Sequence, residues 1–376
     1  MTVSAYESVY VNAFGSPSLV LERGEGVHVW DANGKKYLDL LAGIAVNALG
    51  YADDTMTKAI VEQTNKLAHV SNFFTTPAQI NLAQKLVDLL ESEGGRRGRV
   101  FLCNSGTEAN EGAMKLAMLH KPGGKIIALE GAFHGRTLGA LSITHKPAIR
   151  EPFSQTPGCD FIEPSVTALD ELGDDVAAIF LEPIQGERGV VPLDSEFLKA
   201  ARAKADEIGA LLVLDEIQTG MGRTGRWFAH TGTVQADVVT LAKGLGGGMP
   251  IGAIIATGPA ENLFTPGSHG STFGGNPVVA AASFAVLNKI ETLLDHVSET
   301  GEWLTAELQS KGFAVRGAGL LLGIEVEDAP GLVGEMREKG YIVNATNENT
   351  LRLAPPLIIT RDDLVPFIND LVQLRG

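Results

Sequence analysis

The chain has 376 residues, of which 44% are hydrophobic and 20% are charged, enough for a large core and about two domains. Its formal net charge of −15 disfavours nucleic acid and anionic membranes as partners, so an anionic ligand must be bound by local groups. Residues 1–7 lack the features of a signal peptide, and no apolar run reaches the roughly 18 residues of a membrane helix. We expect a cytoplasmic protein with no nucleic-acid partner, no membrane partner and no metal site.

The first regular element that we expect is a hairpin over residues 27–39, with an Ala-Asn-Gly turn at residues 32–34. The middle of the chain then alternates short apolar runs with helical patterns. These runs contain few polar residues, as expected for strands that are buried on both faces of a sheet. They occupy residues 100–103, 126–129, 176–181, 211–214, 238–241 and 251–256.

Helical patterns separate several of these strands. One helix is expected to begin with Ser195 as its N-cap, because apolar residues then recur at helical spacing. These residues are Leu198, Ala201, Ala205 and Ile208. The alternation of strands and helices predicts an α/β fold with a mostly parallel sheet that is covered by helices on both faces.

The C-terminal part of the chain has a different pattern. From Asn276, an Ala- and Val-rich helical stretch reaches about residue 295. Beyond it, strand-like runs and helical patterns mix, at residues 320–326, 330–339, 341–344, 351–353 and 361–374. We predict a large domain over residues 55–275 and a smaller α+β domain built from both chain ends, residues 1–54 and 276–376.

Two of the predicted strands are followed by a charged residue, Asp215 in one case and Lys243 in the other. Ligands of such sheets bind at the carboxyl ends of the strands, and a buried ammonium group is costly unless it is paired or deprotonated. A Schiff base from Lys243 to pyridoxal 5′-phosphate, with Asp215 facing the pyridine nitrogen, explains both residues. The alternatives are an Asp that caps a turn and a Lys that reaches solvent, but Gly244 and the glycines at 246–248 indicate close backbone approach.

Two loops are candidates for binding phosphate. Residues 103–110 follow a strand and open a helix, where Ser105, Gly106 and Thr107 would present hydroxyl and backbone N–H groups to an anion. A capping box of Ser105 and Glu108 would use the same groups. Thr272, in a second Gly-rich loop, is another candidate donor. The Gly-Lys-Ser/Thr element of a P-loop and a strand-linked dinucleotide fingerprint are both missing from the sequence, which disfavours a nicotinamide enzyme.

Candidate ligand contacts also follow two further strands. Phe133 could stack on a flat heteroaromatic ring or could pack in the core, and Arg136 could bind a carboxylate through paired hydrogen bonds. We interpret His134 as a structural histidine. Glu182 could pair with an Arg, contact a substrate amine or lie on the surface as a simple strand-end acid.

Jointly, these segments resemble the class III, or ω-type, pyridoxal-phosphate aminotransferases, and the resemblance extends over nearly the whole chain. It depends on residues 105–107, 133–137, 181–186, 215–220 and 243. Within the class, residues 133–137, 269–277 and 351–356 are most similar to the N-acetylornithine aminotransferases of arginine biosynthesis. The resemblance implies a fold-type I homodimer with shared active sites at the subunit interface.

The resemblance also implies how the cofactor is held. Lys243 would be the Schiff-base lysine, and Asp215 would face the pyridinium nitrogen. Gln218 would lie near the phenolic oxygen of pyridoxal 5′-phosphate, and Phe133 would stack on its ring. The phosphate would be held by the loop of Ser105, Gly106 and Thr107, and by Thr272 of the partner subunit.

For the substrates, the resemblance implies Arg136 as one contact and Ser271 of the partner subunit as another. Arg352 would clamp a carboxylate of the amino acid or of 2-oxoglutarate, and Glu182 would be the switch that shields or frees this clamp. With Lys243 moving the proton, the implied reaction is transamination of N2-acetyl-L-ornithine with 2-oxoglutarate. The products would be N-acetyl-L-glutamate 5-semialdehyde and L-glutamate.

The sequence departs from the family pattern in two places, and it leaves several alternatives open. Residues 50–54, Gly-Tyr-Ala-Asp-Asp, replace the usual Gly-His-x-His-Pro, and Arg188 stands where relatives tend to have a small residue. The arginine could shift substrate preference or lie on the surface. Alternative donors are ornithine, N-succinylornithine, N-succinyl-diaminopimelate and 4-aminobutyrate. The non-enzyme alternative is a regulatory protein that binds a phosphate-bearing ligand.

Overall fold

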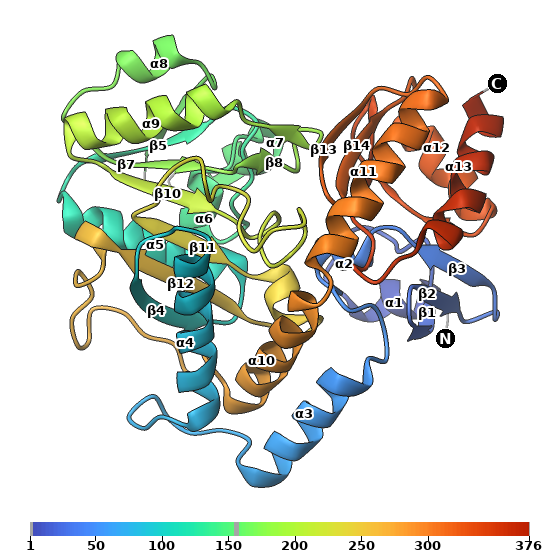
Figure 1. Cartoon of the computed structure of the whole chain (residues 1–376), viewed down its shortest axis with the longest axis horizontal. Helices are drawn as coiled ribbons and strands as arrows, with labels where there is room; N and C mark the ends of the chain where they lie inside the picture. The colour runs from blue at the N-terminus through green and yellow to red at the C-terminus, as the bar shows by residue number, and fades with distance from the viewer. Residues whose placement is uncertain (1–2, 154–157, 376) are drawn as a thin grey trace.

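A seven-stranded sheet forms the centre of the computed structural model, which describes residues 3–153 and 158–375 (Figure 1). Strand β12 is antiparallel to both of its neighbours, and the other neighbouring pairs are parallel, which confirms the predicted mostly parallel α/β sheet. In spatial order the strands are β4 (Gly98–Cys103), β12 (Gly252–Thr257), β11 (Val238–Leu241), β10 (Leu211–Asp215), β7 (Val176–Leu181), β5 (Lys125–Leu129) and β6 (Cys159–Ile162).

Alternate residues of each central strand enter different hydrophobic clusters, because successive side chains of a strand point to opposite faces. In β10, Leu212 and Leu214 belong to one cluster and Leu211 and Val213 to the other. Helix α5 (Gly106–His120) covers one face, while α4 (Pro77–Ser92) and α9 (Ser195–Ile208) pack on the other. Burial on both faces explains why these strands read as continuous apolar runs.

Both ends of the chain form a second, smaller region at the right of Figure 1. The predicted hairpin is confirmed, and β15 pairs in parallel with β3, so the C-terminal segment extends an N-terminal sheet. One sheet has the order β1 (Leu21–Glu25), β2 (His28–Asp31), β3 (Lys36–Asp39), β15 (Tyr341–Ile342); the other has β13 (Val315–Ala318), β14 (Leu321–Glu325), β17 (Thr350–Leu353), β16 (Asn344–Asn347). The helices of this region are α1 (Val3–Val9), α2 (Ala42–Ala45), α11 (Leu294–Ser310), α12 (Ala329–Glu338) and α13 (Arg361–Arg375).

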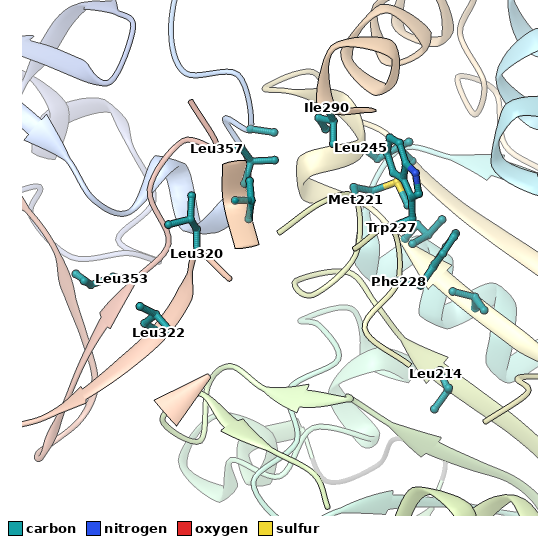
Figure 2. Packing of buried hydrophobic residues seen from close by; sticks show 14 of the residues in the cluster. Leu214, Met221, Trp227, Phe228, Leu245, Ile290, Leu320, Leu322, Leu353 and Leu357 are labelled. Atoms are coloured by element: carbon teal, nitrogen blue, oxygen red, sulfur yellow. The ribbon is translucent and has the colours of Figure 1, made fainter. Parts of the chain in front are cut away.

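The long helical stretch after Asn276 is two helices, and the first of them lies with the large sheet. Helix α10 (Pro277–Glu291) packs on α4 and on α3 (Asp54–Lys66). Figure 2 shows Ile290 of α10 near Leu245 and Trp227, whereas Leu322 and Leu353 lie farther away in the C-terminal region. The domain boundaries therefore stay a prediction, and the packing of α10 favours a division after residue 291.

The remaining elements are short, and the predicted start of one helix is wrong by one residue. Asp194 caps α9 by accepting a hydrogen bond from the Glu196 amide, so Ser195 is the first helical residue. The short elements are α6 (Leu138–Ser142), α7 (Pro147–Arg150), η1 (Glu151–Phe153), α8 (Val166–Asp170), β8 (Ile184–Gln185), β9 (Val191–Pro192), η2 (Lys243–Gly246) and η3 (Gly258–Ala260). Within the described residues no single helix could cross a membrane, and α10 and α11 qualify only as a pair bent by 61°.

Candidate active site

A cavity of about 460 Å³ lies at the carboxyl ends of the parallel strands, where the sequence predicted a ligand site. The loops after β4, β5, β10 and β11 contribute to its wall. Its lining includes Ser105, Thr107, Phe133, Arg136, Asp215 and Lys243, all of which the sequence singled out. Within residues 3–153 and 158–375, no group of three or more His, Cys, Asp or Glu side chains is arranged to hold a metal.

The Asp215 carboxylate is buried, lines the cavity and accepts hydrogen bonds from three donors. Its Oδ2 accepts from Nδ1 of His134 at 2.7 Å and from Nδ2 of Asn110 at 2.8 Å, and its Oδ1 accepts from the Ile217 amide. Burial lowers the pKa of His134, but the bond and charge of Asp215 outweigh this effect and raise it. The interpretation of His134 as a structural histidine stays a prediction; it lines the cavity itself, and its bond holds Asp215 in place.

Lys243 follows β11 and reaches the same cavity from the strand next to Asp215. Its φ of 45° lies in the left-handed region, which costs a non-glycine residue roughly 1–2 kcal/mol. Burial lowers the pKa of Lys243 to about 8, with a contribution from Arg352 in the same direction, against the opposing effect of nearby acids. About a tenth of the amine is thus neutral, and nucleophilic, at pH 7, far more than for an ordinary lysine.

The loop from β4 to α5 forms a cradle for an anion. The first amides of a helix have no acceptor within it, and here these are the amides of Gly106 and Thr107. A Cβ on Gly106 would lie 2.8 Å from Ile217, so glycine is needed for close packing at this point. The predicted capping box is wrong in one half: Ser105 accepts from the Glu108 amide, but Glu108 accepts from the amide of Asn104.

Glu182 is buried behind Phe133 and accepts a hydrogen bond from the Phe133 amide at 2.9 Å. Burial, aided by the charge of Asp215, raises the pKa of Glu182 to about 7. The Phe133 ring lies on the cavity wall, with the guanidinium of Arg136 at 5.8 Å and the ammonium of Lys146 at 5.6 Å from its centroid.

The switch predicted at Glu182 is wrong, because Arg352 pairs with Glu187 instead. Arg352 Nη1 lies 2.6 Å from Glu187 Oε1 and also donates to Gln218 Oε1 at 3.2 Å, while its Nε donates to Asn344. Among the described residues no ion pair joins Glu182 to Arg352. The tight hairpin of β8 and β9 carries Glu187 back toward β17, which spacing along the sequence does not reveal.

Five predicted residues do not line the cavity. Three of them, Glu182, Gln218 and Arg352, are buried close to its lining residues, whereas Ser271 and Thr272 would have to act from a partner subunit. Ser271 accepts hydrogen bonds from Asn104 and from the Gly274 amide, and Thr272 is exposed. The departure at residues 50–54 is structural: the Tyr51 hydroxyl donates to Asp39, and the Tyr51 ring packs on the backbone of Gly24.

The second departure, Arg188, lies exposed over the loop after β5. Its guanidinium donates to the Glu130 carbonyl at 3.3 Å and to Gln185 Oε1 at 3.1 Å. It therefore does not pair with Glu182.

Sequence reasoning missed three residues that the fold brings to the site: Asn110, Glu187 and Lys146. Asn110 lies on the second turn of α5, is fully buried and donates to Asp215, 105 residues away, so spacing along the sequence gave no signal for this contact. Glu187 follows the Gln185-Gly186 motif that was already singled out. Lys146 gave no signal, because its partner is 41 residues away.

The residues present fit pyridoxal 5′-phosphate. A ring nitrogen needs a carboxylate, an aldehyde needs a neutral amine and a phosphate needs backbone N–H groups, and Asp215, Lys243 and the start of α5 supply these three around one cavity. A seven-stranded, mostly parallel sheet with this lysine and this aspartate on neighbouring strands defines a fold-type I pyridoxal-phosphate enzyme.

Comparison with known proteins agrees with the assignment to the pyridoxal-phosphate enzymes. The family model described as aminotransferase class-III matches residues 10–374, so the chain belongs to that family. It is 48% identical to the acetylornithine aminotransferase of Mycolicibacterium smegmatis, over 98% of this chain and 96% of that protein. It is 46% identical to the acetylornithine aminotransferase of Streptomyces coelicolor, over 97% of this chain and 93% of that protein.

Solved structures give the same result. An ornithine aminotransferase of Toxoplasma gondii, described with partial occupancy of PLP at its active site, matches with a TM-score of 0.92 and 31% identity, over 100% of this chain and 94% of that one. The N-acetylornithine aminotransferase of Stenotrophomonas maltophilia K279a matches with a TM-score of 0.84 and 36% identity, over 99% and 98%. The chain is a pyridoxal-phosphate-dependent aminotransferase.

Proposed function

We propose that the chain transfers the terminal amino group of N2-acetyl-L-ornithine to 2-oxoglutarate, in arginine biosynthesis. The observation that carries this proposal is the Arg352–Glu187 pair beside Lys243. The donor has no carboxylate next to its reacting carbon, whereas the acceptor has one. A site that serves both needs a cation that can be covered for the first substrate and uncovered for the second, and Glu187 covering the buried Arg352 would supply it.

The cofactor, when bound, supplies an electron sink for the carbanion that forms when a C–H bond next to nitrogen breaks. Asp215 would hold the ring nitrogen protonated, and the donors on its other side, His134 and Asn110, keep its carboxylate ionised and in place. The amides that open α5 would hold the phosphate, and Phe133 would cover one face of the ring.

Lys243 would bind the cofactor's aldehyde carbon and then carry the proton. Its lowered pKa, about 8, lets the amine both accept a proton and return it near neutral pH. The left-handed backbone holds the start of its side chain in one direction, since the surrounding fold must stabilise that conformation.

Arg136 and Arg352 would bind the substrate carboxylates. Arg136 lines the cavity, so it can contact the remote carboxylate of either substrate. Arg352 is buried and reachable only when Glu187 moves, so it would serve the carboxylate beside the reacting carbonyl of 2-oxoglutarate. Gln218 would keep its amide nitrogen for the cofactor's phenolic oxygen, because its Oε1 is engaged by Arg352.

We further propose a cytoplasmic homodimer in which Ser271 and Thr272 complete the site of the partner subunit. Support comes from an exposed aromatic patch beside that loop: Phe73, Phe74 and Phe273 are 93%, 71% and 61% exposed. Asn72 donates to the Ser271 carbonyl, so the two loops that carry these rings lie together. Light scattering should give twice the chain mass.

The test is to load the protein with pyridoxal phosphate and follow its visible absorbance while adding amines one at a time. The visible absorbance band of the lysine-bound cofactor should disappear at the lowest concentration with N2-acetyl-L-ornithine and return when 2-oxoglutarate is added. This result would support the proposal. A preference for ornithine, N-succinylornithine, N-succinyl-diaminopimelate or 4-aminobutyrate would assign a different substrate. Protein that never develops the band would favour the phosphate-binding regulatory alternative.

A further inference from the structure

Glu187 is shared by two cations, one through each carboxylate oxygen. Oε1 lies 2.6 Å from Arg352 Nη1, and Oε2 lies 3.0 Å from Lys146 Nζ. The three side chains differ in exposure: Arg352 is 1% exposed, Glu187 20% and Lys146 35%. The acid is thus positioned between a buried cation in the site and a second cation nearer to solvent.

Lys146 reaches Glu187 from a separate part of the chain. It caps α7, whereas Glu187 lies in the loop between β8 and β9, and Arg352 lies on β17. The ammonium group of Lys146 is also 5.6 Å from the centroid of Phe133, which lines the cavity. Lys146 therefore lies at the edge of the site without being one of its lining residues.

When a carboxylate replaces Glu187 on Arg352, the acid is the partner that moves. Arg352 has two other acceptors, Gln218 and Asn344, which hold it in place. Glu187 is ionised before the exchange, because Arg352 and Lys146 outweigh the effect of burial and lower its pKa to about 2 in the paired arrangement. A displaced carboxylate without a cation nearby is unfavourable at a partly buried position.

We propose that Lys146 is a positioning residue that retains Glu187 when the carboxylate of the keto-acid acceptor takes its place on Arg352. This role rests on the proposed function, since it concerns the exchange between the two substrates. Lys146 keeps its bond to Oε2 while Oε1 leaves Arg352. It therefore favours binding of dicarboxylate acceptors and leaves the reaction with the amine donor unaffected.

The test compares Lys146→Met, which removes the charge at similar length, with Lys146→Arg, which keeps it. Lys199→Met is the matched control, because Lys199 also pairs with one acid, Glu196 at 2.7 Å, but lies on α9 outside the cavity. Calorimetry measures binding of glutarate, a dicarboxylate that cannot react. Rapid mixing measures the donor and acceptor half-reactions of the loaded enzyme separately.

Lys146→Met should weaken glutarate binding and the apparent affinity for 2-oxoglutarate by about fivefold, the upper end of what a partly exposed ion pair contributes. The donor half-reaction should change by less than about twofold, and Lys146→Arg should restore most of the loss. In a Glu187→Gln background, Lys146→Met should have little further effect, because the acid that it retains is gone.

Equal weakening of donor and acceptor by Lys146→Met, or an equal loss in Lys199→Met, would overturn the proposal. So would a full effect of Lys146→Met in the Glu187→Gln background, which would indicate direct attraction of the acceptor. If wild-type enzyme accepts a different donor, the proposed function fails while the glutarate measurement still decides the role of Lys146.

Discussion

Two carboxylates of the same site, Asp215 and Glu187, are held in opposite ways. Asp215 is buried at the end of a central strand, and its donors come from His134, Asn110 and a backbone amide. Glu187 lies in a short hairpin loop, is partly exposed, and is held by two cationic side chains, Arg352 and Lys146. Loss of either Asp215 side-chain donor would leave a buried carboxylate with fewer hydrogen bonds, whereas Arg352 keeps Gln218 and Asn344 as acceptors when Glu187 leaves.

This difference divides the site into a fixed half and an exchangeable half. The fixed half would hold the one cofactor that serves both half-reactions, so it has no reason to change. The exchangeable half meets two substrates of different charge in turn, so it needs a group that can move. Four substitutions, ordered from the largest expected effect to the smallest, sharpen or break this division.

Replacing Lys243 by Ala should have the largest effect. Loss of the proton carrier should lower the turnover number by at least about 10,000-fold, because no other amine in the described part of the cavity wall can take its place. Turnover and the visible absorbance of the loaded protein are the measurements. Lys199→Ala is the control for the loss of a lysine elsewhere in the chain. An unchanged visible absorbance band in Lys243→Ala would contradict the assignment of Lys243 as the lysine that binds the cofactor.

Asp215→Asn should lower both half-reactions, by about 100- to 1000-fold, since an amide cannot stabilise the protonated ring as a carboxylate does. The variant should still fold, because its Oδ1 can accept from His134 or Asn110. Single-turnover rates of each half-reaction provide the check. Asp206→Asn, at an exposed acid that pairs with Arg202 on α9 outside the cavity, should leave both rates unchanged.

Glu187→Gln should change selectivity more than speed. Without the competing charge, Arg352 is open to any carboxylate beside the reacting carbon, so L-glutamate should gain as an amine donor. The ratio of kcat/KM for N2-acetyl-L-ornithine to that for L-glutamate should fall about tenfold. A ratio that stays constant while both rates fall would place Glu187 in the fixed half instead.

The smallest effect concerns the pH dependence of stability at Glu182. The pKa of Glu182 in the folded chain, about 7, is higher than its usual value, so the folded chain holds this proton more tightly than the unfolded chain. The resulting contribution to the free energy of unfolding is present at acidic pH and lost as the pH rises through about 7. Glu182→Gln avoids this loss and keeps an acceptor for the Phe133 amide. Relative to wild type, its Tm should therefore be higher at pH 8 than at pH 5, by about 2 °C. A difference that does not vary with pH would contradict the raised pKa.

More of the fixed half than of the exchangeable half could be predicted from the sequence, which singled out Arg352 but neither Glu187 as its partner nor Asn110 beside Asp215. Asp215 and Lys243 end apolar runs, and residues 105–107 open a helix, so local pattern is sufficient to place them. The choice between Glu182 and Glu187 depends on a turn at Gly186, where a Cβ would overlap the Gln218 side chain, and on the left-handed Val190. Such long-range packing is not encoded in spacing along the chain.

The same limit of sequence-based prediction affects where helices and domains begin and end. Buried strands were placed within one or two residues by their apolar runs, because burial on both faces leaves a continuous signal. The helix start at Ser195 was one residue late, because Asp194 and Ser195 are both good N-caps. Helix α10 was grouped with the C-terminal region, since its Ala- and Val-rich sequence does not say which neighbour it packs on.

The most direct test of the division is to measure donor and acceptor half-reactions of Asp215→Asn and Glu187→Gln side by side, by rapid mixing with the loaded protein. The account predicts that Asp215→Asn slows both half-reactions to a similar extent, while Glu187→Gln changes the two unequally and shifts the preference toward L-glutamate. Equal slowing of both half-reactions in Glu187→Gln would contradict the account, because the acid would then support the cofactor and not the exchange of substrates.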